Sequence, residues 1–597
     1  MGPLAPGVRQ FIVLLALVQG LLLYLASRGE DNGWWPWSLL GGRVCWYALV
    51  LSVPSAMLLS VRDLREARFW QHAALVALVF ALLGAWAAWS ATGEPSVNAG
   101  AVLAPFSMSM GAALFVALPY LQCRQLHERW CAPYPQLFEL AWQNALTLLL
   151  TALFVGICWA VLWLWGALFR LIGIDFFAEL FGEQWFIYLA TGVMVGLGIL
   201  IGRTQQRPVQ VARRILFAIF TGLLPLLAVV SLLFIASLPF TGLQPLWQTR
   251  SAAITLMSVV GVMVLFTNAV YQDGDDPLPY PRWLRRVVDA GLLALPLFAL
   301  LALYAMGLRI GQHGWTQERL AGVIASLILA GHAFGYAWAV LRPRGEWLSR
   351  LRPVNVLVSL LAIAVTLLVN SPLLDPHRLA VSSQLARLAD GRTPPAEFDV
   401  DFLRFETGRR GVAASRALAA DPALESALGE RIVRALERSE RWYTQAERER
   451  LVQRDDNALR ERIAVVGEAT SLPDSWWQAL AGGRIDLDHD RSCRLPGADC
   501  VAIVRDLDGD GLEDVLLCNL MEQLYPTCRL AAGDGWQRAV AYDFHTFEPA
   551  MPGRRAMSGV VDALRRGEVT PAPRRWPDLD VAGARGRTNP YEGDGGE

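Results

Sequence analysis

The chain of 597 residues contains no lysine, so arginine supplies all 53 of its fixed side-chain cations. A formal net charge of −1 gives no electrostatic basis for binding nucleic acid, which is excluded as an expected partner. The sequence also lacks the G-x-S-x-G motif of serine nucleophiles and the H-E-x-x-H motif of zinc hydrolases. We therefore assign no catalytic residues, and the sequence favours a protein that is not an enzyme.

Charge is also missing from the centres of the long apolar runs. Their polar residues are neutral side chains such as Gln19, Asn144, Asn268, His332 and Asn355. Ion-coupled pumps usually carry acids or arginines at such positions, because they move charge through the bilayer. The sequence argues against a proton-coupled transporter.

What the chain has in abundance is apolar sequence. Its mean hydropathy is +0.34 and 54% of its residues are hydrophobic. About eleven runs approach the ~20 residues that a helix needs to cross hydrocarbon, where backbone groups must pair internally. The predicted spans are Phe11–Ser27, Val44–Val61, Gln71–Ala91, Ala101–Leu121, Ala141–Trp165, Trp185–Ile201, Ile215–Leu238, Ala252–Tyr271, Val287–Gly307, Leu320–Leu341 and Pro353–Asn370.

The arginines predict the orientation of these helices. About seventeen lie at the N-terminus and in one set of alternate loops, against about five in the other set, and such an excess marks the cytoplasmic side. The N-terminus is then cytoplasmic, and an odd number of crossings places the residues after 370 outside. The seventeen are Arg9, Arg62, Arg65, Arg68, Arg124, Arg129, Arg203, Arg207, Arg213, Arg214, Arg282, Arg285, Arg286, Arg342, Arg344, Arg350 and Arg352.

The composition changes abruptly after this bundle. We expect a transmembrane helical domain over 1–370, an extracytoplasmic segment of amphipathic helices over 371–470, a small β-containing domain over 471–570 and a disordered tail over 571–597. The predicted fold class is an α-helical polytopic membrane protein with about eleven transmembrane helices and a C-terminal extracytoplasmic α+β domain.

An aspartate-rich loop, "DLDGDGLED", lies between two short apolar runs of the β-containing domain. Asp506, Asp508, Asp510 and Asp514 occupy positions 1, 3, 5 and 9 of a calcium loop, and Leu512 at position 7 would give its backbone carbonyl. The twelfth position lacks the glutamate of a complete EF-hand. We predict a structural calcium ion, and the alternative is an acidic turn without metal.

Four of the eight cysteines fall in the same domain, at Cys493, Cys500, Cys518 and Cys528. Outside the cytoplasm such a group suggests two disulfides, for which three connectivities exist. Cys500 and Cys518 flank the loop almost opposite each other, so we prefer Cys500–Cys518 together with Cys493–Cys528. A zinc site is the competing interpretation, but the spacings lack a paired C-x₂-C pattern.

Three stretches, "LIGIDFFAELFGEQWF", "LALYAMGLRIGQHGWTQERL" and "NSPLLDPHRLAVSSQLARL", resemble a bacterial multi-pass membrane family catalogued as domain of unknown function 4153. The resemblance covers most of the chain from Met1 to about Arg410. It implies a protein of the bacterial cytoplasmic (inner) membrane whose biochemical role is unassigned. The resemblance assigns no functional residues to this sequence, and the aspartate loop lies outside the stretch that it covers.

These observations favour a non-enzymatic membrane protein that presents a calcium-binding periplasmic module to an envelope partner or ligand. Its partners would be the lipid bilayer and a periplasmic or envelope protein.

One alternative is an enzyme of the polytopic glycosyltransferase type that acts on lipid-linked sugars. Its acids would be Glu30 and Asp31 in the first outer loop, in an outward cavity shared with Asp175 or Glu179. The other alternative is a transporter of a neutral or lipidic solute. It predicts a central cavity that is open to one side and lined by Asn144, Asn268 or Asn355.

Overall fold

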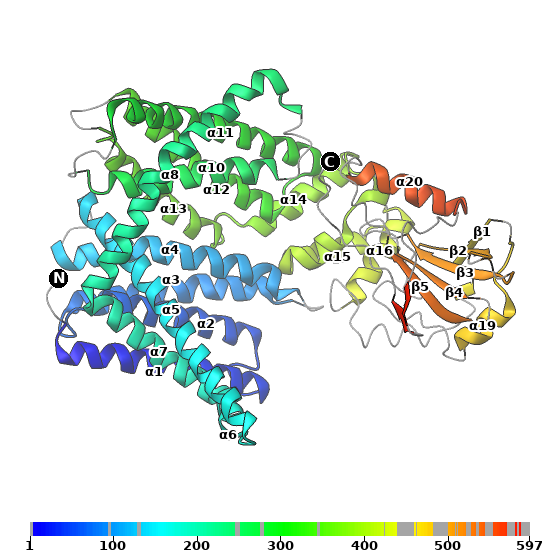
Figure 1. Ribbon diagram of the computed structural model, residues 1–597, viewed down its shortest axis with the longest axis horizontal. Helices are drawn as coiled ribbons and strands as arrows, with labels where there is room; N and C mark the ends of the chain where they lie inside the picture. The colour runs from blue at the N-terminus through cyan, green and yellow to red at the C-terminus, as the bar shows by residue number, and fades with distance from the viewer. Residues whose placement is uncertain are drawn as a thin grey trace. The chain divides into compact units, whose positions relative to one another are not determined.

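Long helices dominate the first part of the chain in the computed structural model (Figure 1). The chain forms two compact units, Met1–Arg441 and Trp442–Glu597. We call the first the membrane unit and the second the C-terminal unit. The structure describes residues 4–597 with the exception of 94–96, 128–132, 245–250, 275–279, 343–346, 423, 439–458, 461–462, 468, 482–492, 494–498, 508, 510, 521–526, 533–535, 544–552, 570–578, 582–583 and 587–597.

Eleven helices of the first unit are long and apolar enough to cross a membrane among the residues described. They confirm the eleven predicted spans. The helices are α1 (Pro6–Asp31), α2 (Leu40–Ser60), α3 (Ala67–Ala91), α4 (Ala99–His127), α5 (Tyr134–Leu171), α7 (Gln184–Thr204), α8 (Gln206–Thr241), α10 (Ala252–Tyr271), α11 (Arg282–His313), α12 (Gln317–Leu341) and α13 (Leu351–Val369). A short helix, α6 (Phe176–Gly182), connects α5 to α7.

Small residues let some of these helices approach closely. Between α1 and α7, a Cβ on Gly192 would lie 2.6 Å from the carbonyl oxygen of Ala16. Lipid is as apolar as leucine, so packing at such small residues is what holds membrane helices together. Prolines lie inside several helices, including Pro105 and Pro119 of α4. Each proline leaves a backbone carbonyl without its usual hydrogen bond, and groups on neighbouring helices can supply a new partner.

Shorter helices follow the last span within the same unit. They are α14 (Pro376–Ala389), η1 (Pro395–Glu397), the π-helical turn η2 (Phe402–Glu406), α15 (Gly408–Ala419) and α16 (Ser426–Glu437). We call them the helical layer. It contacts the bundle, with α14 against α12 and α15 against α3 and α4. Arg387 of α14 adds a contact to α11, because its guanidinium donates to the carbonyl of Gly311 at 2.9 Å.

The second unit contains a five-stranded sheet with strands in the order β1-β2-β3-β4-β5. Strand β1 is parallel to β2 and the remaining pairs are antiparallel. The strands are β1 (Ile463–Val466), β2 (Cys500–Arg505), β3 (Asp514–Asn519), β4 (Thr527–Ala532) and β5 (Gln537–Asp543), and the short strands β6 (Leu579–Val581) and β7 (Ala584–Gly586) form a separate pair.

Both faces of this sheet are buried, which explains its almost continuous apolar strands. Helix α19 (Asp474–Ala481) brings Trp476 and Leu480 to the face that holds Ala502. Helix α20 (Gly553–Arg565) brings Leu564 to the face that holds Ile503. The mostly helical chain with a small mixed sheet at its C-terminal end agrees with the predicted fold class.

Candidate functional site

The membrane unit contains a cavity of about 520 Å³ among α4, α5, α8, α10, α12 and α13. This volume lies within the range of about 300–1,000 Å³ typical of small-molecule sites. Most of its wall is apolar and aromatic, and a few neutral polar groups interrupt it. The lining residues are Phe115, Val116, Pro119, Tyr120, Tyr134, Leu137, Phe138, Ala141, Trp142, Ala145, Leu216, Phe220, Leu265, Asn268, His332, Asn355, Val356 and Ser359.

A hydrogen-bonded network lies at one side of this cavity. The hydroxyl of Tyr336 contacts the side-chain oxygens of Asn268 at 2.9 Å and of Asn355 at 2.8 Å. The Asn355 amide donates to Asn268 at 2.7 Å and to the Tyr134 hydroxyl at 3.1 Å. Tyr336 is fully buried and Asn268 and Asn355 line the cavity, so the network fixes the orientation of these two amides.

The cavity bears on the transport alternative, which named Asn144, Asn268 and Asn355 as lining residues. Two of them line the cavity and the third does not. Asn144 instead exchanges two amide hydrogen bonds with Gln122, at 2.9 and 3.2 Å. Gln122 also donates to the carbonyl of Leu59 at 3.0 Å, so this pair joins α2, α4 and α5 as a packing element.

A smaller pocket of about 130 Å³ lies where α3, α4, α12, α13 and α14 meet. At roughly 30 Å³ per water molecule it has room for about four waters. It is lined by Trp86, Ala87, Ser90, Val102, Pro105, Phe106, Ser109, Gln317, Leu320, Ala321, Val369, Asn370, Asp375, Pro376 and His377.

A buried ion pair borders the smaller pocket. The Asp375 side chain is 4% exposed and pairs with the guanidinium of Arg410 from α15, which is 16% exposed. The same guanidinium lies 4.8 Å from the ring centroid of Trp89 and 5.1 Å from that of Trp86. Asp375 also caps α14, because it accepts the backbone N–H of His377 at 3.0 Å. The pair therefore holds the helical layer against α3.

His377 is a neutral base at this position. Burial lowers the pKa of its imidazole to about 4; the charge of Asp375 opposes the shift, and that of Arg410 adds to it. The Gln317 amide nitrogen lies 2.5 Å from Nδ1 of His377. An amide nitrogen can only donate, so Nδ1 accepts and the ring is neutral.

The acids of the glycosyltransferase alternative are not brought together around either pocket of the described residues. Glu30 forms an ion pair with Arg43. Asp175 lies 3.5 Å from Arg170, with both side chains more than 60% exposed. Exposed pairs of this kind are solvated surface contacts.

The aspartate loop joins β2 to β3. The Asp506 carboxylate accepts the backbone N–H groups of Gly509 at 2.7 Å and Gly511 at 3.0 Å. The buried carboxylate of Asp514 accepts the N–H of Leu507 at 3.0 Å. Of the other predicted ligands, Leu512 is half exposed, whereas Asp508 and Asp510 lie outside the described residues. No group of three or more His, Cys, Asp or Glu side chains suited to a metal ion occurs in the described part of the chain.

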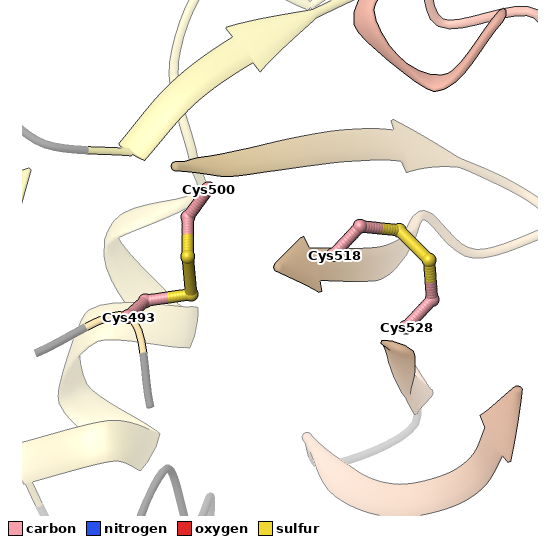
Figure 2. Close-up of a disulfide and its surroundings, with 4 residues drawn as sticks. All are labelled: Cys493, Cys500, Cys518 and Cys528. Atoms are coloured by element: carbon pink, nitrogen blue, oxygen red, sulfur yellow. A yellow bond between two sulfur atoms is a disulfide. The ribbon is translucent and has the colours of Figure 1, made fainter. Parts of the chain in front are cut away.

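The disulfides differ from the preferred pairing. The bridges are Cys493–Cys500 and Cys518–Cys528 (Figure 2), so the predicted Cys500–Cys518 and Cys493–Cys528 pairs are wrong. In the β2–β3 register, Cys518 faces Val501. Cys500 is the neighbour of Val501 and points to the other face of the sheet, because strand side chains alternate. Cys518 lies directly opposite Cys528 on β4.

Sequence reasoning missed the residues that complete both pockets. Tyr336 and Tyr134 of the network carried no signal beyond their place in apolar runs. Asp375 did carry one, since an aspartate before Pro376 is a helix start. Its partner Arg410 is separated from it by thirty-five residues, and no local pattern joins them.

The helices define a multi-pass membrane protein. The chain belongs to the family described as Domain of unknown function (DUF4153), whose model matches residues 47–415. Both pockets are built entirely from residues within that range. No curated protein and no solved structure matches the chain.

Proposed function

We propose that the membrane unit binds an uncharged amphiphile in the 520 Å³ cavity. The observation that carries this proposal is the composition of the cavity wall. Aromatic and aliphatic side chains, among them Phe115, Trp142 and Phe220, form a surface for an apolar chain. The amides of Asn268 and Asn355 offer hydrogen bonds to a hydroxyl or amide group of the ligand.

The wall also favours a neutral head group over a charged one. It contains tyrosine, serine, asparagine and histidine side chains but no acid and no arginine among its described residues. A charged group in such a wall would lose its hydration without gaining an opposite charge. A hydroxyl-bearing lipid would keep its hydrogen bonds.

Filling the cavity tests this function. A photoactivatable monoglucosyl lipid is bound to the purified full-length protein, and labelled peptides are located by mass spectrometry. Ala141→Trp and Ala145→Trp place a large ring in the cavity wall, and each is expected to reduce labelling of α4 and α8 at least tenfold. Leu149→Trp is the matched control, because Leu149 lies on the same helix, is 62% exposed and is not part of the cavity. Equal labelling in all variants would contradict the proposal.

The location of the protein is a separate part of the proposal. The arginine-rich loops support a bacterial inner-membrane protein with a cytoplasmic N-terminus and a periplasmic C-terminus. A reporter that is active only in the cytosol, fused to Glu597, should remain inactive. Activity of that fusion would reverse the orientation.

A second candidate function concerns the C-terminal unit, which we propose carries a structural calcium ion and meets an envelope partner in the periplasm. The ligands would be Asp506, Asp508, Asp510 and Asp514 with the carbonyl of Leu512. Two features favour it. The Asp506 carboxylate is oriented by two backbone N–H groups of its own loop, and Asp514 is held at the other end of the loop.

Calcium dependence of stability tests this second candidate. Extracellular sites of this kind have Kd values of about 10⁻⁴–10⁻³ M, so calcium at about ten times Kd should stabilise the folded unit by about 1.4 kcal/mol. Asp508→Ala combined with Asp510→Ala should abolish the difference between melting in calcium and in chelator. Identical melting of the wild type in calcium and in chelator would refute the metal site.

A further inference from the structure

Three helices, α4, α12 and α13, line both pockets of the membrane unit, and α4 and α13 are in direct contact. Residues 115–120 of α4 border the cavity, and residues 102–109 border the smaller pocket. On α13 the order is reversed, with residues 355–359 at the cavity and Val369 and Asn370 at the smaller pocket. The two pockets thus lie at opposite ends of one pair of contacting, antiparallel helices.

A hydrogen bond joins these helices at each pocket. The hydroxyls of Tyr120 and Ser359 are 2.6 Å apart at the cavity. The Asn370 amide donates to the Ser109 hydroxyl at 3.0 Å at the smaller pocket. The two bonds are eleven residues apart on both helices, or about 16 Å at 1.5 Å per residue. The stretch between them, which we call the α4–α13 seam, covers about half of the ~30 Å hydrocarbon layer.

Both helices have features that allow the ends of the seam to open separately. Pro119 lines the cavity and Pro105 lines the smaller pocket, and each proline removes a backbone hydrogen bond at which α4 can bend. The buried residues of α13 are Leu351, Val354 and Val358, all in its first half. The second half of α13 has no fully buried side chain, and its Leu367 is partly buried against the core formed by α1–α4.

The polar groups along this route are neutral. The cavity offers hydroxyl, amide and imidazole groups. The smaller pocket offers the hydroxyls of Ser90 and Ser109 and the amides of Gln317 and Asn370, while the charge of Asp375 is paired with Arg410. A hydroxyl-bearing head group would meet hydrogen-bonding partners at both ends of the seam.

We propose that the α4–α13 seam is the path along which the membrane unit moves an uncharged, hydroxyl-bearing amphiphile between the two leaflets. This inference rests on the proposed binding function of the cavity. The head group passes between the helices while the apolar chain moves from the cavity wall into the surrounding lipid. The Tyr120–Ser359 and Ser109–Asn370 bonds act as the gates at the two ends.

Cross-linking each gate tests the path. The full-length protein, with Cys45, Cys123, Cys131 and Cys158 replaced by serine, receives either Ser109→Cys with Asn370→Cys or Tyr120→Cys with Ser359→Cys. Each pair is joined by a short bifunctional methanethiosulfonate after reconstitution into phosphatidylcholine vesicles. Transfer of a fluorescent monoglucosyl lipid between leaflets is followed by its access to dithionite.

The parent protein is expected to accelerate transfer at least tenfold over empty vesicles. Either cross-link should return the rate to that of empty vesicles. The matched control is Trp159→Cys with Thr191→Cys, because these side chains form a hydrogen bond of 3.1 Å between α5 and α7, away from the seam. The cross-link between these two cysteines should leave transfer unchanged. A fluorescent phosphatidylglycerol should not be transferred.

The outcomes separate the path from the binding function. Transfer that continues after both gates are cross-linked overturns the path, as does transfer of phosphatidylglycerol at an equal rate. Photolabelling of the cavity without any transfer by the parent protein also overturns it, and leaves the binding function intact. Equal photolabelling of the cavity variants and of the Leu149→Trp control overturns the binding function itself.

Discussion

The two units of this protein bury polar atoms in different ways. In the spans of the membrane unit, buried neutral amides bond to one another, as Gln122 and Asn144 do. In the C-terminal unit the polar backbone is satisfied by a sheet, one disulfide joins β3 to β4, and the other ties the segment around Cys493 to β2. The bundle thus depends on packing in lipid, and the sheet depends on covalent links. The units should therefore respond to different perturbations.

Reduction of the disulfides should give the largest effect and should be confined to one unit. Cys518→Ser with Cys528→Ser removes the bridge between adjacent positions on β3 and β4. Loss of a native disulfide from a small domain costs about 2–5 kcal/mol. Hydrogen exchange of the full-length protein should show faster exchange in β2–β4 and no change in α10–α12. Equal acceleration of hydrogen exchange in both units would show that the two units do not respond differently to loss of the disulfide.

The prediction of the spans succeeded because it needed only local information. Ala252–Tyr271 was predicted with the bounds that α10 has. Helix α5 extends from Tyr134 to Leu171, beyond the predicted Ala141–Trp165, because an apolar run marks the hydrocarbon-spanning centre and not the helix ends.

The two pockets and the pairing of the disulfides could not be predicted in the same way, because they depend on contacts between residues far apart in the sequence. The cavity unites side chains from Phe115 to Ser359, and its volume is what remains after six helices pack. The disulfide pairing depended on a strand register, in which a shift of one residue moves Cys500 to the other face. The aspartate loop was visible as a motif, and its occupancy by calcium stays a prediction.

The next effect concerns the one buried ion pair discussed for the membrane unit. Asp375→Asn keeps the size of the side chain and its capping oxygen but removes the charge opposite Arg410. Breaking a fully buried pair costs about 3–5 kcal/mol, and the partial exposure of Arg410 reduces the expected cost to about 2 kcal/mol.

The matched control for this change is Asp390→Asn in the same helical layer. Asp390 pairs with Arg392, and both side chains are more than half exposed, so the expected cost is below about 0.5 kcal/mol. Thermal unfolding in detergent measures both variants. Equal destabilisation would show that the Asp375 pair is a surface contact in energetic terms.

A third effect, similar in size to that of Asp375→Asn, is a pH dependence of the helical layer, and it sharpens the contrast with the C-terminal unit. The pKa of His377 is about 4 in the folded protein and about 6.5 in an unfolded chain. Between these values the unfolded chain binds the additional proton, so stability is lost as the pH falls from 6.5 towards 4. The loss is about 2 kcal/mol once partial exposure of the imidazole is considered. His377→Gln cannot take up this proton and should lose less stability over the same range, and the difference between the two proteins cancels the titration of carboxylates that do not interact with this imidazole. Exchange in α14 should report this difference, whereas β2–β4 should exchange alike in both proteins at every pH. If the wild type and His377→Gln lose the same stability in α14, protonation of this imidazole does not control the contact between the helical layer and the bundle.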